Sequence, residues 1–419
     1  MSAVANSWTQ LRVGDLGEVF TGRTPPSGTQ GLFGETYPFI TPGDMRQGKY
    51  ARKTDRCLSH DGAALLRRIR LPANSVCVSC IGWQMGEVII TDRISFTNQQ
   101  INTIVPKAEY DASYLYYTFR LRKQELLSLG SAAGARTPIL NKSAFCNLKI
   151  RVPSLSMQRR IASILGAYDD LIETNQRRVA LLEEMALRLF EEWFVRFRFP
   201  GNESHAMVET PDGLLPKGWS MTRLGDLTSY ISRGITPAYD ASATSLAINQ
   251  KCIRDQRVSL QLARTQSKPV PKEKLVQSGD VLINSTGVGT LGRVAQAEAI
   301  PEGLTVDTHV TIVRPERRLD RDFFGLALLR MEPLLERLGV GATGQTELNR
   351  SRIADIGVAE PPSNLQTVFG RHARPLRELA FQLTRQSEGL AASRELLLPR
   401  LISGELSVAD AERDLKDAA

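Results

Sequence analysis

Apolar side chains recur every seven positions between residues 156 and 197, in two parallel rows. Two such rows over about five heptads predict one long helix with a coiled-coil seam along it. Asn175 is the polar member of the seam, and it would either fix the helix register at a cost in stability or lie at the seam edge. Ser156 fits the N-cap position, and Pro200-Gly201 would end the helix. The predicted seam consists of Ile161, Leu165, Tyr168, Ile172, Asn175, Val179, Leu182 and Leu189.

The same spacing returns between residues 366 and 401 and predicts a second long helix. Pro375 lies inside this stretch and should kink the helix or mark its true start. Gly404 would close the helix, and the polar tail after Ser407 is expected to fray. The apolar stripe comprises Phe369, Leu376, Leu383, Leu390 and Leu397.

Each predicted helix needs a partner that buries its stripe. Because a whole domain-sized segment separates the two helices, we expect them to pair with each other in antiparallel orientation; a homodimeric coiled coil is the alternative. At 1.5 Å per residue, each helix would be roughly 55–60 Å long. The expected arrangement is a rod with one domain at each end, related by a pseudo-twofold axis.

The two segments that precede these helices share sequence. The run W-T-Q-L-R-V-G-D-L begins at Trp8, and W-S-M-T-R-L-G-D-L begins at Trp219, 211 residues later. Further matches follow in order, such as Leu140-Asn141-Lys142-Ser143 with Leu348-Asn349-Arg350-Ser351. A period near 210 residues is far too long for a solenoid, so we expect two related globular domains.

Both domains are predicted to be mixed α/β, which makes the chain α+β, with two pseudo-repeated domains joined by two long helices. An amphipathic helix is expected over Tyr114–Leu129, with its counterpart at Phe323–Leu338. Short β-type runs between turn signals predict strands at Val19–Thr21, Pro38–Ile40, Ser75–Ile81, Glu87–Thr91 and Ile101–Val105. The predicted boundaries are 1–152 for the first domain, 153–200 for the central helix, 201–218 for a linker, 219–360 for the second domain and 361–419 for the C-terminal helix and tail.

The charge balance adds a class of partner. A net charge of +8 and a pI near 9.3 favour an anionic partner, most commonly nucleic acid, over an ordinary basic surface. The first residues carry no signal-peptide pattern, and no apolar run approaches about 18 residues, so we expect no membrane segment and a cytoplasmic location. Five scattered cysteines fit a reducing compartment.

Sequence motifs for catalysis, cofactor binding or metal binding are weak. Gly287-Val288-Gly289-Thr290-Leu291-Gly292 satisfies G-x-G-x-x-G after a strand-like run, but Pro301-Glu302-Gly303 interrupts the helix that a dinucleotide site requires. A second match that begins at Gly339 follows a helix instead of a strand. Cys77-x-x-Cys80 has no second pair nearby, and the four histidines form no ligand spacing. We therefore expect no catalysis by this chain alone, no cofactor and no metal.

Polar and basic loops at equivalent places in both domains remain, and they favour DNA binding. Arg and Lys read guanine, and Asn and Gln read adenine, through paired hydrogen bonds in the major groove. Hydroxyls and backbone N–H groups suit phosphates. Any single one of these residues could equally be part of an ordinary solvated loop, so the prediction rests on their recurrence in register. The candidates are Arg23, Thr24, Trp83, Gln84, Asn98, Gln99, Arg136, Arg233, Gln250, Lys251, Asn284, Ser285, Thr286, His309, Gln345 and Thr346.

Several motifs resemble those of one known family, and the likeness covers nearly the whole chain in both halves. They are Trp219 with Leu224-Gly225-Asp226-Leu227, Gly279-Asp280-Val281-Leu282, Gly344-Gln345-Thr346-x-Leu348-Asn349, the run from Pro153 to Ala162, the run from Leu165 to Ile172, and Leu397-Leu398-Pro399-Arg400-Leu401. With these the chain resembles the specificity subunits of type I restriction–modification enzymes.

The resemblance implies a non-catalytic subunit in which each domain is a target-recognition domain for one half of a bipartite DNA site. It further implies that the two helices form an antiparallel coiled coil, which spaces the half-sites and docks two modification (methyltransferase) subunits. Restriction subunits, which translocate and cleave DNA, would then join. Trp83 stands where the repeat has Val288, so the two half-sites should differ.

Two other functions compete with this one. A stand-alone methyltransferase or nuclease would need methyl-donor and base-flipping motifs, which the sequence lacks. A coiled-coil DNA-binding regulator outside restriction–modification would have to be a dimer.

Overall fold

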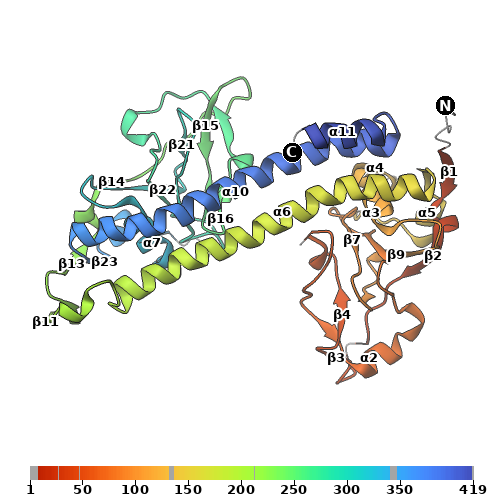
Figure 1. The fold of residues 1–419 in the computed structure, drawn as a ribbon, viewed down its shortest axis with the longest axis horizontal. Helices are drawn as coiled ribbons and strands as arrows, with labels where there is room; N and C mark the ends of the chain where they lie inside the picture. Colours follow the sequence, from red (N-terminus) through yellow and green to blue (C-terminus); the bar gives the residue numbers. More distant parts are fainter. Residues whose placement is uncertain are drawn as a thin grey trace. The chain divides into compact units, whose positions relative to one another are not determined.

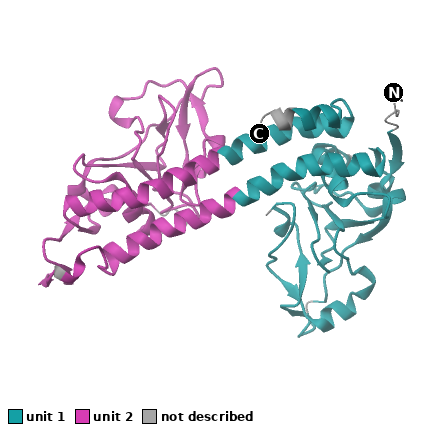
Figure 2. Ribbon diagram, in the orientation of Figure 1, with its two compact units in different colours: residues 1–174, 386–419 teal, residues 175–385 magenta. Residues whose placement is uncertain are grey.

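The computed structural model describes residues 8–26, 28–46, 48–131, 136–211, 213–339 and 347–417. The chain divides into two compact units (Figure 2). Unit 1 consists of Met1–Thr174 and Gln386–Ala419, and unit 2 consists of Asn175–Arg385. Each unit therefore contains its own globular domain and its own length of both long helices. Among the described residues, no helix combines the length and apolar character that a membrane crossing requires.

Unit 1 is built on an antiparallel sheet in the order β2-β9-β6-β7. Its strands are β2 (Gly17–Thr21), β9 (Ile101–Pro106), β6 (Val76–Ser79) and β7 (Val88–Ile90). A second sheet has the order β3-β5-β4-β8, in which β4 and β8 run parallel. Its strands are β3 (Phe33–Gly34), β5 (Cys57–Leu58), β4 (Tyr37–Ile40) and β8 (Phe96–Thr97). β1 (Thr9–Arg12) pairs with β10 (Lys149–Val152), and the domain helices are α1 (Val13–Leu16), α2 (His60–Leu65), α3 (Ala112–Leu121), α4 (Lys123–Ser131) and α5 (Lys142–Asn147).

Unit 2 repeats this strand order with β14-β22-β19-β20, again antiparallel. These strands are β14 (Thr228–Arg233), β22 (Val310–Pro315), β19 (Val281–Asn284) and β20 (Val294–Gln296). Its second sheet, β18-β15-β21, contains one parallel pair, β15 with β21, and β13 pairs with β23 as β1 does with β10. The remaining elements are β11 (Met207–Thr210), β12 (Gly213–Pro216), β13 (Ser220–Arg223), β15 (Ser245–Ile248), β16 (Ile253–Arg254), β17 (Arg257–Val258), β18 (Arg264–Gln266), β21 (Thr305–Val306), β23 (Gly357–Glu360), α7 (Arg321–Arg330), α8 (Glu332–Arg337) and α9 (Arg350–Ala354).

The two long helices are α6 (Leu155–Phe190) and α10 (Ser363–Ser403), and each contributes to both units (Figures 1 and 2). In unit 1, Asp169 of α6 pairs with Arg394 of α10. In unit 2, Val179 of α6 packs with Leu383 of α10, and Trp193, in the π-helical turn Glu191–Val195 that follows α6, contacts Phe369 of α10. In unit 2 residue numbers rise on α6 as they fall on α10, so the helices pack antiparallel there, and the ribbon shows the same opposite directions in unit 1 (Figure 1).

The seam residues from the heptad rows are buried or half-buried. Ile161, Leu165, Asn175, Val179 and Leu383 are buried, and Tyr168, Ile172, Leu182, Leu189, Leu376, Leu390 and Leu397 are half-buried. Asn175 is 1% exposed, so it lies inside the protein and not at an exposed seam edge.

Each long helix is joined to its domain by one glutamine, Gln158 in α6 and Gln366 in α10. Gln158 accepts a hydrogen bond from the backbone N–H of Asp111 and donates to the carbonyl of Pro153, each at 2.9 Å. Gln366 does the same with Asp320 at 3.1 Å and Pro361 at 2.9 Å. Asp111 and Asp320 are in turn the N-caps of α3 and α7. The repeated Pro–Gln spacing in the sequence therefore has a structural cause, since each glutamine ties a domain helix to a long helix.

Several details of the predicted elements need correction. α6 starts one residue earlier than expected, because Ser154 and not Ser156 accepts the capping hydrogen bond, from the N–H of Met157. Pro375 does not break α10, which runs through it; the proline is exposed, so its ring faces away from the packed side. The single helix expected at Tyr114–Leu129 is two helices, α3 and α4, because the N–H of Arg122 turns back to the carbonyl of Phe119.

The second domain helix and two polar segments also differ from expectation. The stretch Phe323–Leu338 is split into α7 and α8, with Pro333 in the first turn of α8. The predicted linker contains the hairpin β11–β12. The tail forms α11 (Val408–Asp417) instead of fraying, because Val408 and Ala411 are buried in the core of unit 1.

Candidate nucleic-acid interface

In unit 1 the candidate loops meet at one end of the main sheet. β2 and β6 both pair antiparallel with β9, so the C-terminal ends of β2 and β6 lie beside the N-terminal end of β9. Arg23 and Thr24 follow β2, Trp83 and Gln84 follow β6, and Gln99 precedes β9. Three loops that are far apart in the sequence are thereby placed at the same edge.

Direct hydrogen bonds hold these loops together. The Thr24 hydroxyl donates to Gln99 Oε1 at 2.7 Å, and the backbone N–H of Arg23 donates to the carbonyl of Thr97 at 2.9 Å. The N–H of Gly82 donates to the carbonyl of Pro138 at 2.9 Å, which brings in the segment that contains Arg136. The side chains of Arg23, Gln84, Gln99 and Arg136 are exposed. This end of the sheet thus presents hydrogen-bonding and cationic groups on a fixed backbone.

Asn98 has a different place from its neighbours. Its side chain is buried, its Nδ2 donates to Gln100 Oε1 at 2.9 Å, and its Oδ1 accepts from the N–H of Gln100 at 3.1 Å. In this structure Asn98 therefore shapes the loop before β9, and its amide does not face outward.

Unit 2 brings its candidate residues to the same end of its own sheet. Arg233 ends β14, Thr286 follows β19 and His309 precedes β22. The backbone bonds match those of unit 1. The carbonyl of Ser285 accepts from Leu348 at 2.9 Å and its N–H donates to His309 at 2.8 Å, as Cys80 does with Leu140 at 2.9 Å and Gln100 at 2.7 Å.

Three polar candidates of unit 2 are more buried than expected and form hydrogen bonds inside the protein. Asn284 and Ser285 are fully buried: Asn284 donates to the carbonyl of Gln250 at 2.9 Å, and the Ser285 hydroxyl contacts that of Thr311. Arg233 is half-buried, donates to the carbonyl of Leu348 at 3.2 Å and pairs with Glu347 at 2.6 Å. These three residues hold the sheet end together from within, because their polar groups face other parts of the chain.

Four more candidates of unit 2 differ in exposure. Lys251 and His309 are exposed, and Gln250 and Thr286 are half-buried. The Thr286 hydroxyl lies 2.6 Å from His309 Nδ1. Gln345 and Thr346 lie outside the described residues.

Two glycines at matching positions make this geometry possible, and the sequence pattern did not reveal their role. A Cβ on Gly22 would lie 2.2 Å from the carbonyl oxygen of Asn98, and one on Gly234 would lie 1.8 Å from that of Val306. Both distances are far below van der Waals contact, so the chain leaves β2 and β14 only where no side chain is present.

Comparisons with known proteins identify relatives of this chain. The family model described as "Type I restriction modification DNA specificity domain" matches residues 6–184. The specificity subunit of the type I restriction enzyme MjaIX from Methanocaldococcus jannaschii is 27% identical, over 97% of this chain and 95% of that protein. The HindI specificity subunit from Haemophilus influenzae is 33% identical over 38% of this chain and 36% of that protein. Residues 6–184 therefore match the type I restriction–modification specificity domain, and the whole chain is similar to a type I specificity subunit over nearly its full length.

A solved structure shares the fold. The crystal structure of the type I restriction–modification S subunit from M. genitalium covers 96% of this chain and 98% of its own, with a TM-score of 0.61 and 17% identity. The specificity subunits of type I restriction–modification enzymes are the non-catalytic components of those enzymes.

The glycine-rich loop and the cysteines of this chain have structural explanations. Gly287–Gly292 joins β19 to the antiparallel strand β20, whereas a dinucleotide site joins a strand to a helix. Burial raises the pKa of both Cys77 and Cys80 to about 12, so both thiols stay protonated at neutral pH. Within the described ranges, no cluster of three or more His, Cys, Asp or Glu side chains could hold a metal ion.

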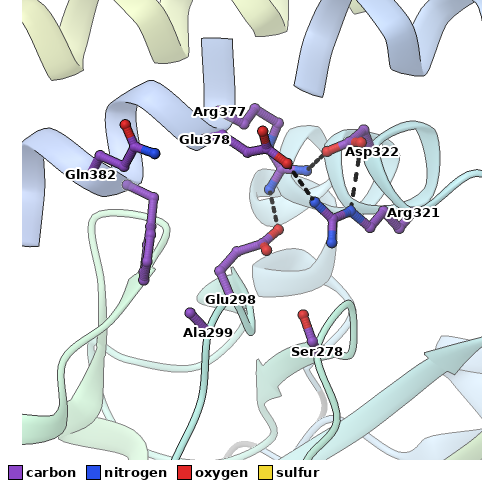
Figure 3. Close-up of a pocket in the computed structure, with 9 residues that line it drawn as sticks. Ser278, Glu298, Ala299, Arg321, Asp322, Arg377, Glu378 and Gln382 are labelled. Carbon is purple, nitrogen blue, oxygen red and sulfur yellow. Dashed lines mark hydrogen bonds and ion pairs between the residues drawn. The ribbon is translucent and has the colours of Figure 1, made fainter. Parts of the chain in front are cut away.

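An ionic network that sequence reasoning missed links the second domain of this chain to α10. Asp322 of α7 is 1% exposed and accepts hydrogen bonds from Arg374 at 2.9 Å and Arg377 at 3.0 Å, both on α10. Arg377 also lies 3.8 Å from Glu298, and Arg321 lies 3.2 Å from Glu378. All of these charged groups except Arg374 line a pocket of about 290 Å³ (Figure 3).

Unit 1 uses a corresponding Asp–Arg contact. Asp169 of α6 pairs with Arg394 of α10 and accepts a hydrogen bond from the Tyr117 hydroxyl of α3 at 2.5 Å. Arg120 of α3 pairs with Glu395 of α10 at 2.7 Å. In both units, therefore, a half-buried or buried carboxylate links a domain helix to α10.

The carboxyl of Glu298 in this pocket gives a pH-dependent prediction. Burial raises its pKa, while Arg377 and Arg321 oppose the shift. The folded state then holds this proton more tightly than the unfolded state, so its contribution to stability is present at acid pH and is lost as pH rises through the raised pKa. We expect Glu298→Gln to gain stability relative to wild type between pH 4 and pH 7 in urea unfolding. Glu302→Gln, on the exposed turn nearby, should give no such gain; equal behaviour of the two variants would contradict the prediction.

Proposed function

We propose that this specificity subunit reads an asymmetric, bipartite DNA site through two target-recognition domains, residues 1–152 and 219–360. The observation that carries the proposal is the same sheet end occurring twice, with matching backbone bonds and different exposed side chains. Central helix 153–200 and the C-terminal segment 361–419 would join the domains, with residues 201–218 as the connection.

The chemistry of the exposed side chains supports duplex DNA as the ligand. Arg23, Arg136 and Lys251 offer cationic donors, which suit guanine edges and phosphates, and Gln84 and Gln99 offer the paired groups that suit adenine. Thr24, Thr286 and His309 lie at the same ends and complete the proposed surface. Gln345 and Thr346 stay in the proposal on sequence grounds alone.

The buried candidates, together with the half-buried Arg233 and Gln250, have a supporting role in this proposal. Asn98, Asn284, Ser285 and Arg233 fix the loops, and Gln250 stands below the loop that carries Gly287. Their substitution would therefore alter recognition indirectly, through loop position.

The two ends differ in ways that favour two different half-sites. The turn after β6 carries Trp83, and the matching turn after β19 carries Val288. Ile81 bridges to Ile139 in unit 1, and the matching bridge in unit 2 joins Thr286 to Glu347. An apolar pair in one domain and a charged residue in the other present different surfaces to the bases.

We further infer that α6 and α10 form one antiparallel coiled coil that spaces the half-sites and docks two methyltransferase subunits. Antiparallel packing within each unit supports this. Leu181 and Met185 lie one turn apart on α6 and are exposed, which suits a surface that a partner covers. Restriction subunits would join the complex that the methyltransferase subunits form.

Asn175 gives a test of the spacing role. We expect Asn175→Leu to leave binding to each half-site unchanged while the complex accepts spacers one base pair shorter or longer, because a buried polar seam residue restricts helix register. The measurement is methylation of duplexes that differ only in spacer length. Gln176→Leu, at the exposed neighbouring position, is the matched control. An unchanged spacer preference in Asn175→Leu would count against the idea.

The proposal as a whole is tested by single-molecule methylation sequencing of host DNA, with and without the gene for this chain. We expect an asymmetric bipartite motif whose adenine methylation disappears on deletion. Unchanged methylation, together with failure of the chain to bind its methyltransferase subunits, would contradict the proposed function and favour a regulator outside restriction–modification.

A further inference from the structure

Trp83 is an exposed aromatic side chain on a fixed turn. It is 67% exposed, whereas Trp193 and Trp219 are buried. Among the described residues, no ring or cation contact involves Trp83. A tryptophan side chain is one of the largest apolar surfaces a protein can bury, so its display on this turn calls for a ligand with an apolar face.

The turn that carries Trp83 is held in place on both sides. Gly82 and Gly86 have positive φ angles of 96° and 89°, which close the turn tightly. The N–H of Met85 donates to the carbonyl of Gly82 at 3.0 Å, and that of Gly86 donates to the carbonyl of Ser79 at 2.8 Å. The Met85 side chain is buried beneath the turn. The indole is therefore presented by a backbone that needs little ordering on binding.

The surroundings of Trp83 define the ligand. Ile139, which is 51% exposed, bridges to Ile81, two residues before Trp83. The loops at this sheet end, residues 21–26, 82–86, 97–101 and 136–142, contain Arg23, Arg136 and Lys142 and no Asp or Glu. An apolar wedge within a cationic, hydrogen-bonding rim fits a polyanion with flat apolar faces, which is stacked DNA.

We propose that Trp83 acts as a wedge that stacks on, or inserts beside, one base step of the half-site read by the first domain. This inference rests on the proposed function and adds a mode of recognition to it. Apolar wedges that unstack a base step bend DNA and favour steps that deform easily, so the first half-site would be read partly through deformability. The second domain has Val288 at this position, 86% exposed but without a ring, and would read its half-site without the wedge.

The test uses the complex of this chain with its methyltransferase subunits and the duplex that methylation sequencing identifies. We expect Trp83→Ala to weaken binding about ten- to a hundred-fold, as removal of a stacking aromatic does. Trp83→Phe should retain most of the affinity, and Val288→Ala, the matched variant in the second domain, should change it by less than about twofold. With 2-aminopurine placed at successive positions, the wild-type complex should change the fluorescence at one step of one half-site, and Trp83→Ala should not.

Salt dependence separates a wedge from a phosphate contact. Trp83→Ala should lower affinity equally at all salt concentrations, whereas Arg136→Ala should lower the slope of log affinity against log salt by about 1. Equal affinity of Trp83→Ala and wild type, or a reduced salt slope for Trp83→Ala, would overturn the wedge. Failure of the wild-type complex to distinguish the identified duplex from a scrambled one would instead overturn the proposed function.

Discussion

Replacing Asp322 with alanine is expected to lower the free energy of unfolding of unit 2 by about 3 kcal/mol. Asp322 is almost fully buried and holds two arginines of α10, Arg374 and Arg377. Removing the carboxylate leaves Arg377 largely buried without its shortest partner, since Glu298 is 3.8 Å away. The cost of an uncompensated buried charge exceeds what the pair itself contributes, and it falls on the joint between the second domain and α10.

Urea unfolding followed by tryptophan fluorescence measures this change. Trp193 and Trp219 both belong to the core of unit 2 and report its unfolding. The matched control is Asp355→Ala, which removes an exposed carboxylate paired with Arg223 and should cost less than about 0.5 kcal/mol. The loss of stability in Asp322→Asn should lie between those of Asp322→Ala and Asp355→Ala, because asparagine keeps the shape of the side chain and loses its charge. Coincident curves for Asp322→Ala and Asp355→Ala would contradict the assignment.

The long helices were predictable because their pattern is regular and long. Heptad rows of apolar residues in α6 and α10 dominate any local preference, so both helices and their buried faces followed from spacing alone. Pro375 shows the limit of local rules. Its effect depends on which side of the helix it occupies, and the exposed face of α10 accommodates the ring.

Short polar segments were predicted less well, because tertiary contacts decide their structure. The tail after Ser407 looks polar, yet two small apolar residues, Val408 and Ala411, reach the core of unit 1 and stabilise α11. The linker before Trp219 likewise contains a hairpin that no strong alternation announced. In both segments, a few apolar residues are enough to stabilise the element, because the folded protein offers an apolar surface against which they pack.

The candidate site was predictable as a set of loops but not residue by residue. Recurrence of the loops in both halves selected residues that the structure brings to corresponding ends of the two main sheets. Composition could not tell exposed from buried polar groups, and Asn284 and Ser285 are buried because each finds a hydrogen-bonding partner inside the sheet end. That outcome depends on the pairing of β19 with β22, which a single strand does not specify.

The second large effect is expected from Gly22→Ala and Gly234→Ala. Each added methyl group would lie about 2 Å from a backbone carbonyl, so the chain must shift where it leaves β2 or β14. Overpacking of this kind costs about 1–3 kcal/mol, which a domain of this size tolerates, but it displaces the loops that carry Arg23 or adjoin Arg233. We therefore expect folded complexes whose methylation of the bipartite site falls about five- to a hundred-fold, as the same energy range in the barrier would produce.

Half-site duplexes assign each loss to its domain. The Gly22→Ala complex should still reject changes in the half-site read by the second domain, and Gly234→Ala should still reject changes in the other. Gly28→Ala is the control, because a Cβ there meets no atom within 4 Å. Normal methylation by both variants, with the chain folded, would mean that these sheet ends do not face DNA. The two glycines occupy the same place in two sheets that present different side chains. If the same Gly→Ala change impairs recognition of one half-site at Gly22 and of the other half-site at Gly234, then the repeated sheets position the loops and the loops determine which bases are read.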